Sequence, residues 1–208
     1  MSVAARGDVL VVLAGGRSRR FGSDKAVAPF DSEPLALRAL RRLSTVAPRR
    51  VVVRAAPLAG LPADVVQVAD PHPGEGPLQA LAAAFAAAPA PRWFVAPCDL
   101  PWLDDSIHAR LAAEIGGSAV AAARAPDGLE PLVSLWTPPA AERLSGWLAF
   151  EPQLAAHAAL ERLGAAEVEF AEPRPFLNVN TREELELALA VARPEPAPLA
   201  AGAAVAPR

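Results

Sequence analysis

Lysine is almost absent from this sequence of 208 residues. Of its 20 basic residues, 19 are arginines, and Lys25 is the single lysine. Tyrosine is missing altogether, and the two asparagines are Asn178 and Asn180. Arginine evidently serves in most basic positions of this chain. A position that keeps the compact ammonium of lysine is therefore a candidate for a role that the planar guanidinium does not fill.

Cysteine and histidine are too few for most structural metal sites. Cys98 is the only cysteine, which excludes an internal disulfide and any zinc site built on several cysteines. The three histidines, His72, His108 and His157, lie far apart in the sequence. No histidine is near Cys98, so we expect a small buried residue there rather than a nucleophile. A net charge of -3 argues against a domain that binds nucleic acid.

Long apolar runs are also lacking, although 52% of the residues are hydrophobic. The most apolar stretch, residues 81–88, is rich in alanine and ends at Pro89, whereas a membrane-spanning helix needs about 20 apolar residues. The apolar run at residues 9–14 is shorter than the ~7–15 residues of a secretory signal core. The sequence therefore predicts a cytoplasmic protein without membrane contact.

Short apolar runs alternate with segments of helical spacing in the first half of the chain. Such runs suit strands that are buried on both faces of a parallel sheet, and four are found at residues 9–13, 51–53, 65–68 and 93–96. Three helical segments lie at residues 35–43, 78–87 and 107–115. This alternation predicts an α/β fold that is Rossmann-like, with three layers (α/β/α) and a mostly parallel central sheet.

The second half is less regular. We expect strands at residues 120–123, 132–136 and 167–170, and helices at residues 140–148 and 152–163. A last helix should begin at Thr181, where Glu184 has the spacing of a capping box, and should end near Arg193. We expect one domain over residues 1–193, followed by a disordered Pro/Ala-rich tail at residues 194–208.

A glycine-rich and basic loop follows the first predicted strand. It reads LAGGRSRRFGSDK from Leu13 to Lys25. Glycines after a strand let backbone N–H groups approach an anion, and the basic side chains add charge opposite phosphates. The loop is neither a Walker A loop nor a dinucleotide fingerprint. A tight turn with solvated arginines is the alternative, but the position after the first strand, the charge density and the single lysine favour phosphate binding.

Carboxylate and amide side chains lie after the strand expected at residues 93–96 and before the last expected helix. Asp99 follows the run at residues 93–96, where a carboxylate can hold a Mg²⁺ that bridges phosphates; the alternative is a cap for the helix that begins near Asp104. Asn178 and Asn180 face the same side of an extended segment before the last helix. Their amides can bind phosphate or complete a magnesium shell, and the alternative is turn or capping chemistry.

A third segment should border the same crevice. Asp70 follows the third predicted strand, and Gly76, Pro77 and Leu78 open the helix that comes next. Arg54 stands at the end of the second strand. In open parallel sheets ligands bind beyond the carboxyl ends of the strands, so these residues are candidates for ligand contacts.

The loop LAGGRSRRFGSDKA, together with PCDLP at residues 97–101 and FLNVNT at residues 176–181, resembles the molybdenum cofactor guanylyltransferase family. This family is one of the nucleotidyltransferases with the nucleotide-diphospho-sugar transferase-like fold. The resemblance covers most of residues 8–192 and is loose from 120 to 165. It implies Mg²⁺-dependent transfer of GMP from GTP to the terminal phosphate of molybdopterin, with release of pyrophosphate. Transient contact with other molybdenum cofactor proteins is compatible with it.

The resemblance also implies roles for individual residues. Asp99 would bind Mg²⁺ and act in catalysis with Lys25 and Arg19, and Asn180, ahead of Asn178, would belong to the active site. The nucleotide contacts would come from Leu13, Ala14, Gly15, Gly16, Lys25, Arg54, Asp70, Gly76, Pro77, Leu78 and Asp99. The segment Glu130-Pro131-Leu132 stands where the family places a similar acceptor-side segment.

The chain departs from the family pattern at two positions. Ala80 ends GPLQA where the family has GPLAG, and Arg54 stands where we expect a family asparagine, which bears on the choice of base. Guanine is favoured because LAGG and PCDLP resemble the guanylyl enzymes, whereas cytidylyl relatives tend to read LAAG. Three alternatives stay open: a cytidylyltransferase, a sugar-phosphate nucleotidyltransferase, and a non-catalytic nucleotide-binding domain of the same fold.

Overall fold

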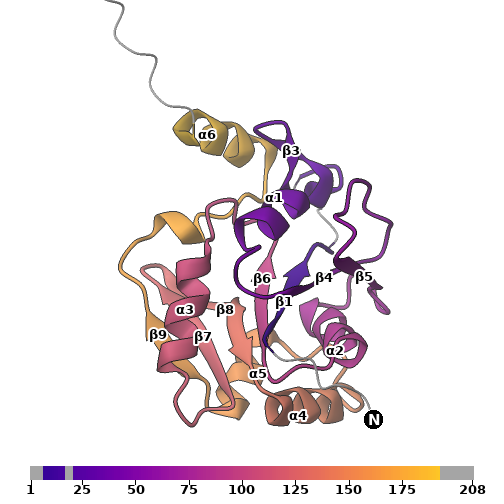
Figure 1. Cartoon of the computed structure of the whole chain (residues 1–208), viewed down its shortest axis with the longest axis vertical. Coiled ribbons are helices and arrows are strands. Elements are labelled where there is room, and N and C mark those ends of the chain that lie inside the picture. Colours follow the sequence, from indigo (N-terminus) through magenta and orange to yellow (C-terminus); the bar gives the residue numbers. More distant parts are fainter. Residues whose placement is uncertain (1–6, 17–20, 193–208) are drawn as a thin grey trace, which may run out of the picture.

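A seven-stranded sheet forms the centre of the molecule (Figure 1). The computed structural model describes residues 7–16 and 21–192, so Arg19 and the predicted tail at 194–208 lie outside the described residues. The strand order is β5-β4-β1-β6-β8-β7-β9, and β8 alone runs antiparallel to its neighbours. The strands are β1 (Val9–Leu13), β4 (Arg49–Arg54), β5 (Val65–Ala69), β6 (Trp93–Pro97), β7 (Val120–Ala125), β8 (Gly128–Trp136) and β9 (Ala166–Glu169).

Helices cover both faces of the sheet. Along β1, Leu10 and Val12 pack into the core beneath α1 and α3, whereas Val9, Val11 and Leu13 pack beneath α2, α4 and α5. The alternation of strand side chains therefore produces two apolar layers, and the predicted three-layer α/β/α fold with a mostly parallel sheet is confirmed. The helices are α1 (Leu35–Arg42), α2 (Pro77–Ala87), α3 (Asp105–Glu114), α4 (Pro138–Leu148), α5 (Ala156–Leu163) and α6 (Arg182–Ala192).

Three details differ from the sequence-based expectation. Strand β5 is not buried on both faces, because it is an edge strand and Val66 is 56% exposed. Helix α5 begins at Ala156, after a turn in which Leu154 N–H donates to the Glu151 carbonyl. A hairpin of β2 (Pro29–Phe30) and β3 (Glu33–Pro34) was not expected from the sequence. Its turn residues have positive φ without being glycine, so it lacks the usual hairpin signal.

Helix α6 begins with the predicted capping box. Thr181 Oγ1 accepts a hydrogen bond from Glu184 N–H at 3.1 Å, and Glu184 Oε2 accepts one from Thr181 N–H, also at 3.1 Å. The helix packs on the β2–β3 hairpin through a separate apolar cluster that includes Phe30, Trp102 and Leu185. Its start, and with it the segment that precedes α6, is therefore held firmly against the rest of the domain.

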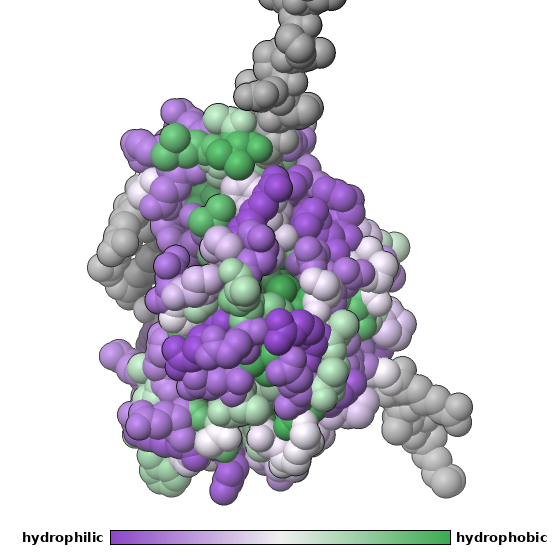
Figure 2. Space-filling model, turned by 90° about the vertical axis from the view of Figure 1, so that its left-hand side faces the viewer, coloured by the Kyte–Doolittle hydropathy of each residue, from purple (hydrophilic) through white to green (hydrophobic). Residues whose placement is uncertain are grey.

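The surface is mainly polar on the face that Figure 2 presents, with apolar surface at the end of the molecule where α6 lies. The large apolar side chains that α6 exposes are Leu187 and Val191. In the part of the chain that the structure describes, no helix is long and apolar enough to cross a membrane.

Asp8 is a buried carboxylate at the amino end of β1. It accepts two hydrogen bonds from Arg92, both at 2.9 Å, and lies 2.8 Å from Nε2 of His108. Burial raises the pKa of Asp8, but the hydrogen bonds from His108 and Arg92 outweigh it and leave the pKa below its ordinary value. The ionised form of Asp8 is thus stabilised more in the folded chain than in the unfolded chain.

We expect Asp8→Asn to lower the free energy of unfolding by about 2 kcal/mol at neutral pH, because Arg92, which is half-buried, and His108 lose the buried carboxylate that they contact. A lowered folded-state pKa gives stability that is present above the unfolded pKa and lost as the pH falls through the folded pKa. Denaturant titrations should therefore show the difference shrinking in acid, with the exposed Asp127→Asn as control. A difference that stays constant down to about pH 3 would contradict this account.

Candidate functional site

A crevice opens at the carboxyl ends of β1, β4 and β5. Two adjoining cavities of about 520 and 390 Å³ share Gly15, Gly16, Asp70 and Gly74 in their walls. Together they fall in the size range of small-molecule sites, and they lie where ligands bind in open α/β sheets. The first cavity is also lined by Ala14, Gly22, Ser23, Asp24, Arg54, Ala55, Ala56 and Pro73, and the second by Leu13, Val53, Gly76, Pro77, Ala80 and Leu132.

The glycine-rich loop enters this crevice directly from β1. Ala14 N–H donates to the Val53 carbonyl at 2.9 Å, so the loop leaves the sheet along β4. Gly16 has φ +124°, a backbone conformation that favours glycine. A Cβ on Gly15 would lie 3.5 Å from Oδ2 of Asp70, which shows how closely that carboxylate approaches the loop. The loop backbone and Asp70 therefore face the same space.

The amino end of α2 forms the opposite wall of the second cavity. Gly76 caps the helix with φ +107°, and Pro77 occupies its first turn. The N–H groups of a helix start attract negative charge, which suits a nucleotide site. The side chain of Leu78 packs in the apolar core, so among the three predicted contacts only Gly76 and Pro77 line the cavity.

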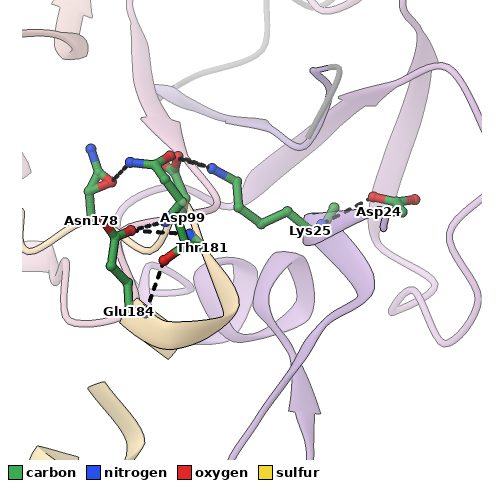
Figure 3. A network of polar contacts seen from close by, with 8 residues as sticks. Asp24, Lys25, Asp99, Asn178, Thr181 and Glu184 are labelled. Carbon is green, nitrogen blue, oxygen red and sulfur yellow. Dashed lines mark hydrogen bonds and ion pairs between the residues drawn. The ribbon is translucent and has the colours of Figure 1, made fainter. Parts of the chain in front are cut away.

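Beside the crevice, Lys25 joins three segments that are far apart in the sequence (Figure 3). Its Nζ donates to Oδ2 of Asp99 at 2.5 Å and to Oδ1 of Asn180 at 2.9 Å. Asn180 Nδ2 in turn donates to Oδ1 of Asn178 at 2.9 Å. Lys25 begins the short 3-10 helix η1 (Lys25–Val27), Asp99 follows β6, and the two asparagines precede α6. All four residues were singled out from the sequence.

The alternative roles for these residues in helix capping do not fit the structure. The cap of α3 is Asp104, whose Oδ1 accepts from Ser106 N–H at 3.0 Å, and Asp99 instead contacts Lys25. The side chain that caps α6 is that of Thr181. Val179 N–H donates to the Asp99 carbonyl at 2.9 Å, which fixes the asparagine segment beside β6.

Cys98 is buried, as expected, and its thiol is unsuited to nucleophilic attack. Burial, and next the charge of Asp99, raise the pKa of Cys98 to about 12. A thiol with so high a pKa is not ionised near neutral pH.

Asp24 is a site residue that sequence reasoning missed. Its Oδ1 caps η1 through Ala26 N–H at 3.1 Å, and its Oδ2 accepts from Nη2 of Arg54 at 2.5 Å. Arg54 is 4% exposed, and its Nε and Nη1 have no hydrogen-bond partner among the described residues. Asp24 thus holds the buried guanidinium of Arg54, and both residues line the first cavity. The only signal in the sequence was an Asp two residues before Ala26, an ordinary capping spacing.

The residues beside Lys25 fit a magnesium ion. In the described ranges, no three His, Cys, Asp or Glu side chains are grouped so that they could hold a metal. Oδ2 of Asp99 and Oδ1 of Asn180 nevertheless converge on one cation, the ammonium of Lys25. One carboxylate and one amide oxygen suit Mg²⁺, which usually takes few protein ligands and completes its shell with water and substrate phosphates.

Glu130 provides a further carboxyl group close enough to respond to Asp99. Burial raises the pKa of Glu130 above its ordinary value, and the charge of Asp99 adds to the rise. Strand β8 carries Glu130, and a shift in register between β7 and β8 follows it, so that Ala123 pairs with Glu130 and Ala122 with Ser134. The three residues between them include Leu132, which lines the second cavity.

Comparison with known proteins agrees with this geometry. Residues 10–168 match the model of the MobA-like NTP transferase domain. A protein named molybdenum cofactor guanylyltransferase from Sinorhizobium fredii is 35% identical to this chain, over 84% of this chain and 87% of the relative. A protein of the same name from Burkholderia orbicola is 36% identical, over 84% of this chain and 92% of the relative. The crystal structure of molybdopterin-guanine dinucleotide biosynthesis protein A from Archaeoglobus fulgidus is similar in fold. Its TM-score is 0.74 with 23% identity, over 88% of this chain and 98% of that one.

Both the family model and the relatives cover most of the chain, and residues 10–168 include the crevice, the glycine-rich loop and all but the first and last residues of the sheet. The chain therefore belongs to the molybdenum cofactor guanylyltransferase family and is a nucleotidyltransferase with a MobA-like NTP transferase domain.

Proposed function

We propose that this protein transfers GMP from GTP to the terminal phosphate of molybdopterin, with Mg²⁺ as its cofactor. The observation that carries the proposal is the convergence of Lys25, Asp99 and Asn180 beside a crevice lined by the glycine-rich loop. The names of relatives that are 35% and 36% identical over 84% of the chain support guanylyl transfer to the molybdenum cofactor.

The reaction needs positioning and charge neutralisation rather than a general base. An oxygen of the molybdopterin phosphate attacks the α-phosphorus of GTP, a new phosphoanhydride bond forms, and the α–β bond breaks with release of pyrophosphate. The second pKa of a phosphate monoester is about 6, so the attacking group is already largely ionised at neutral pH. Two polyanions must then be held together against their repulsion.

The residues around Lys25 are suited to this task. We assign the ammonium of Lys25 to the transferred phosphate, and the N–H groups of Gly15 and Gly16 to the phosphate chain. Asp99 and Asn180 would hold the Mg²⁺, which when bound neutralises charge on the phosphates and orients them. The resemblance adds Arg19 as a further phosphate contact, and we retain that assignment as part of the proposal.

The first cavity offers a complement to guanine. Arg54 and Asp70 both line this cavity; Nε and Nη1 of Arg54 are buried without a partner among the described residues, and the Asp70 carboxylate lies beside the loop. Guanine carries two acceptors, O6 and N7, on one edge and N–H donors beside them. We assign Arg54 to O6 and N7 and Asp70 to the base's N–H groups, which favours GTP over CTP. The arginine thereby takes the place of the expected family asparagine.

Incubation with molybdopterin, Mg²⁺ and an equimolar mixture of GTP and CTP, followed by mass spectrometry, tests the reaction itself. The expected product is molybdopterin guanine dinucleotide together with pyrophosphate. A cytosine dinucleotide would reverse the choice of base. Turnover with sugar 1-phosphates in place of molybdopterin would favour the sugar-phosphate enzymes, and no product with any acceptor would favour a non-catalytic domain.

Conservative substitutions test the residues. Lys25→Arg and Asp99→Asn should each lower turnover by at least about 100-fold, because each removes charge or geometry at the reacting phosphate. Thermal melts should show that both variants stay folded. The control is Arg41→Lys, which exchanges arginine and lysine in the salt bridge of Arg41 with Glu33 at the surface. It should leave turnover unchanged. Undiminished turnover of Lys25→Arg would refute the role of the ammonium.

The role of Arg54 is tested with GTP and 7-deaza-GTP, which differ only at N7. The parent protein should bind GTP about tenfold more tightly, the effect of losing one good contact to the base edge. In Arg54→Ala the two nucleotides should bind equally, as measured by calorimetry. Equal loss of affinity for both nucleotides, with the tenfold ratio kept, would show that Arg54 contacts another part of the nucleotide.

A further inference from the structure

The ammonium of Lys25 contacts the two oxygen atoms, on Asp99 and Asn180, that would bind the metal. Its Nζ lies 2.5 Å from Oδ2 of Asp99 and 2.9 Å from Oδ1 of Asn180. The side chains of Lys25 and Asp99 are 15% and 19% exposed, so water screens this ion pair less than one at the surface. A Mg²⁺ ion needs its oxygen ligands at about 2.0–2.1 Å and would occupy nearly the same volume. The two cations therefore exclude one another at this place.

The surrounding contacts orient both oxygens toward the shared place. Asn180 Nδ2 donates to Oδ1 of Asn178, which turns Oδ1 of Asn180 toward Lys25. The backbone N–H of Asn180 donates to Oε2 of Glu184 at 2.6 Å, in the first turn of α6. Asn178 and Glu184 are thus positioning residues that hold Oδ1 of Asn180 beside Oδ2 of Asp99.

We propose that Lys25 holds the metal position in the nucleotide-free protein and that the phosphates of the incoming nucleotide draw its ammonium away, which opens Asp99 and Asn180 to a divalent cation. The flexible four-carbon stem of lysine permits this exchange. An arginine would form a bidentate pair with Asp99 and would be harder to displace. The inference rests on the proposed function only for the identity of the two bound species, a nucleotide and a divalent cation.

Manganese binding to the nucleotide-free protein tests the exchange by electron paramagnetic resonance of free Mn²⁺. Because Lys25→Met removes the competing cation, it should bind Mn²⁺ at least tenfold more tightly than the parent protein. Adding Asp99→Asn to Lys25→Met should abolish the gain. Equal affinity of the parent protein and Lys25→Met, or a gain that survives Asp99→Asn, would overturn the proposal.

Arg182→Met is the matched control, since it also removes one positive charge, at the start of α6, and the Nε of Arg182 donates to the Phe21 carbonyl rather than to Asp99 or Asn180. It should leave Mn²⁺ affinity unchanged. An equal gain in this control would mean that net charge alone acts, which would also overturn the exchange.

A second measurement uses the parent protein, so it holds even if Lys25→Met fails to fold. With Lys25 as the single lysine, isotope labelling of lysine gives one side-chain NMR signal, at the Cε and Nζ atoms. The signal should shift when Mg²⁺ and a non-hydrolysable GTP analogue are added together. A signal unmoved by saturating amounts of both would refute the exchange. Neither measurement requires molybdopterin or turnover, so failure of guanylyl transfer would be seen separately.

Discussion

The contact of Lys25 with Asp99 and Asn180 is the interaction on which the rest of the site depends. It joins the end of the glycine-rich loop, the carboxyl end of β6 and the segment before α6. Each partner is held by its own local structure. Asp24 caps η1, Val179 N–H bonds the Asp99 carbonyl, and the capping box of α6 fixes Asn180. The fold thereby brings one ammonium and two oxygen atoms together, and in our proposal a nucleotide phosphate draws the ammonium away from them.

The proposed site has two chemically different sides, the crevice itself and the Lys25 contacts beside it, and the order of strands explains why. Strand β1 lies between β4 and β6, so its loop borders Arg54 and Asp70 on one side and Asp99 on the other. Figure 3 shows the same division in the loop itself, because the side chains of Asp24 and Lys25 extend in opposite directions. We interpret the Arg54 side as the base end and the Lys25 side as the phosphate and metal end.

Much of the fold, and the residues that meet at Lys25, could be predicted from the sequence for physical reasons. Continuous apolar runs indicated the central strands, because residues buried on both faces of a sheet are apolar throughout. The motifs indicated Lys25, Asp99 and Asn180, which the structure brings into contact. The exposed edge of β5 and the turn before α5 depend on tertiary packing, which a run of apolar residues does not reveal. The β2–β3 hairpin uses Asp31 and Ser32 at positive φ, and Asp24 matters through a partner 30 residues away in Arg54.

The proposed exchange gives a reason for the place of the single lysine: a chain that uses arginine elsewhere would keep one ammonium where a compact, displaceable cation is needed. The most direct test is a crystal structure with Mn²⁺ and a non-hydrolysable GTP analogue, with the metal located by anomalous scattering. The account predicts Mn²⁺ on Asp99 and Asn180, with Nζ of Lys25 on a phosphate oxygen and guanine beside Arg54. Mn²⁺ bound elsewhere, with Lys25 still paired to Asp99, would contradict it.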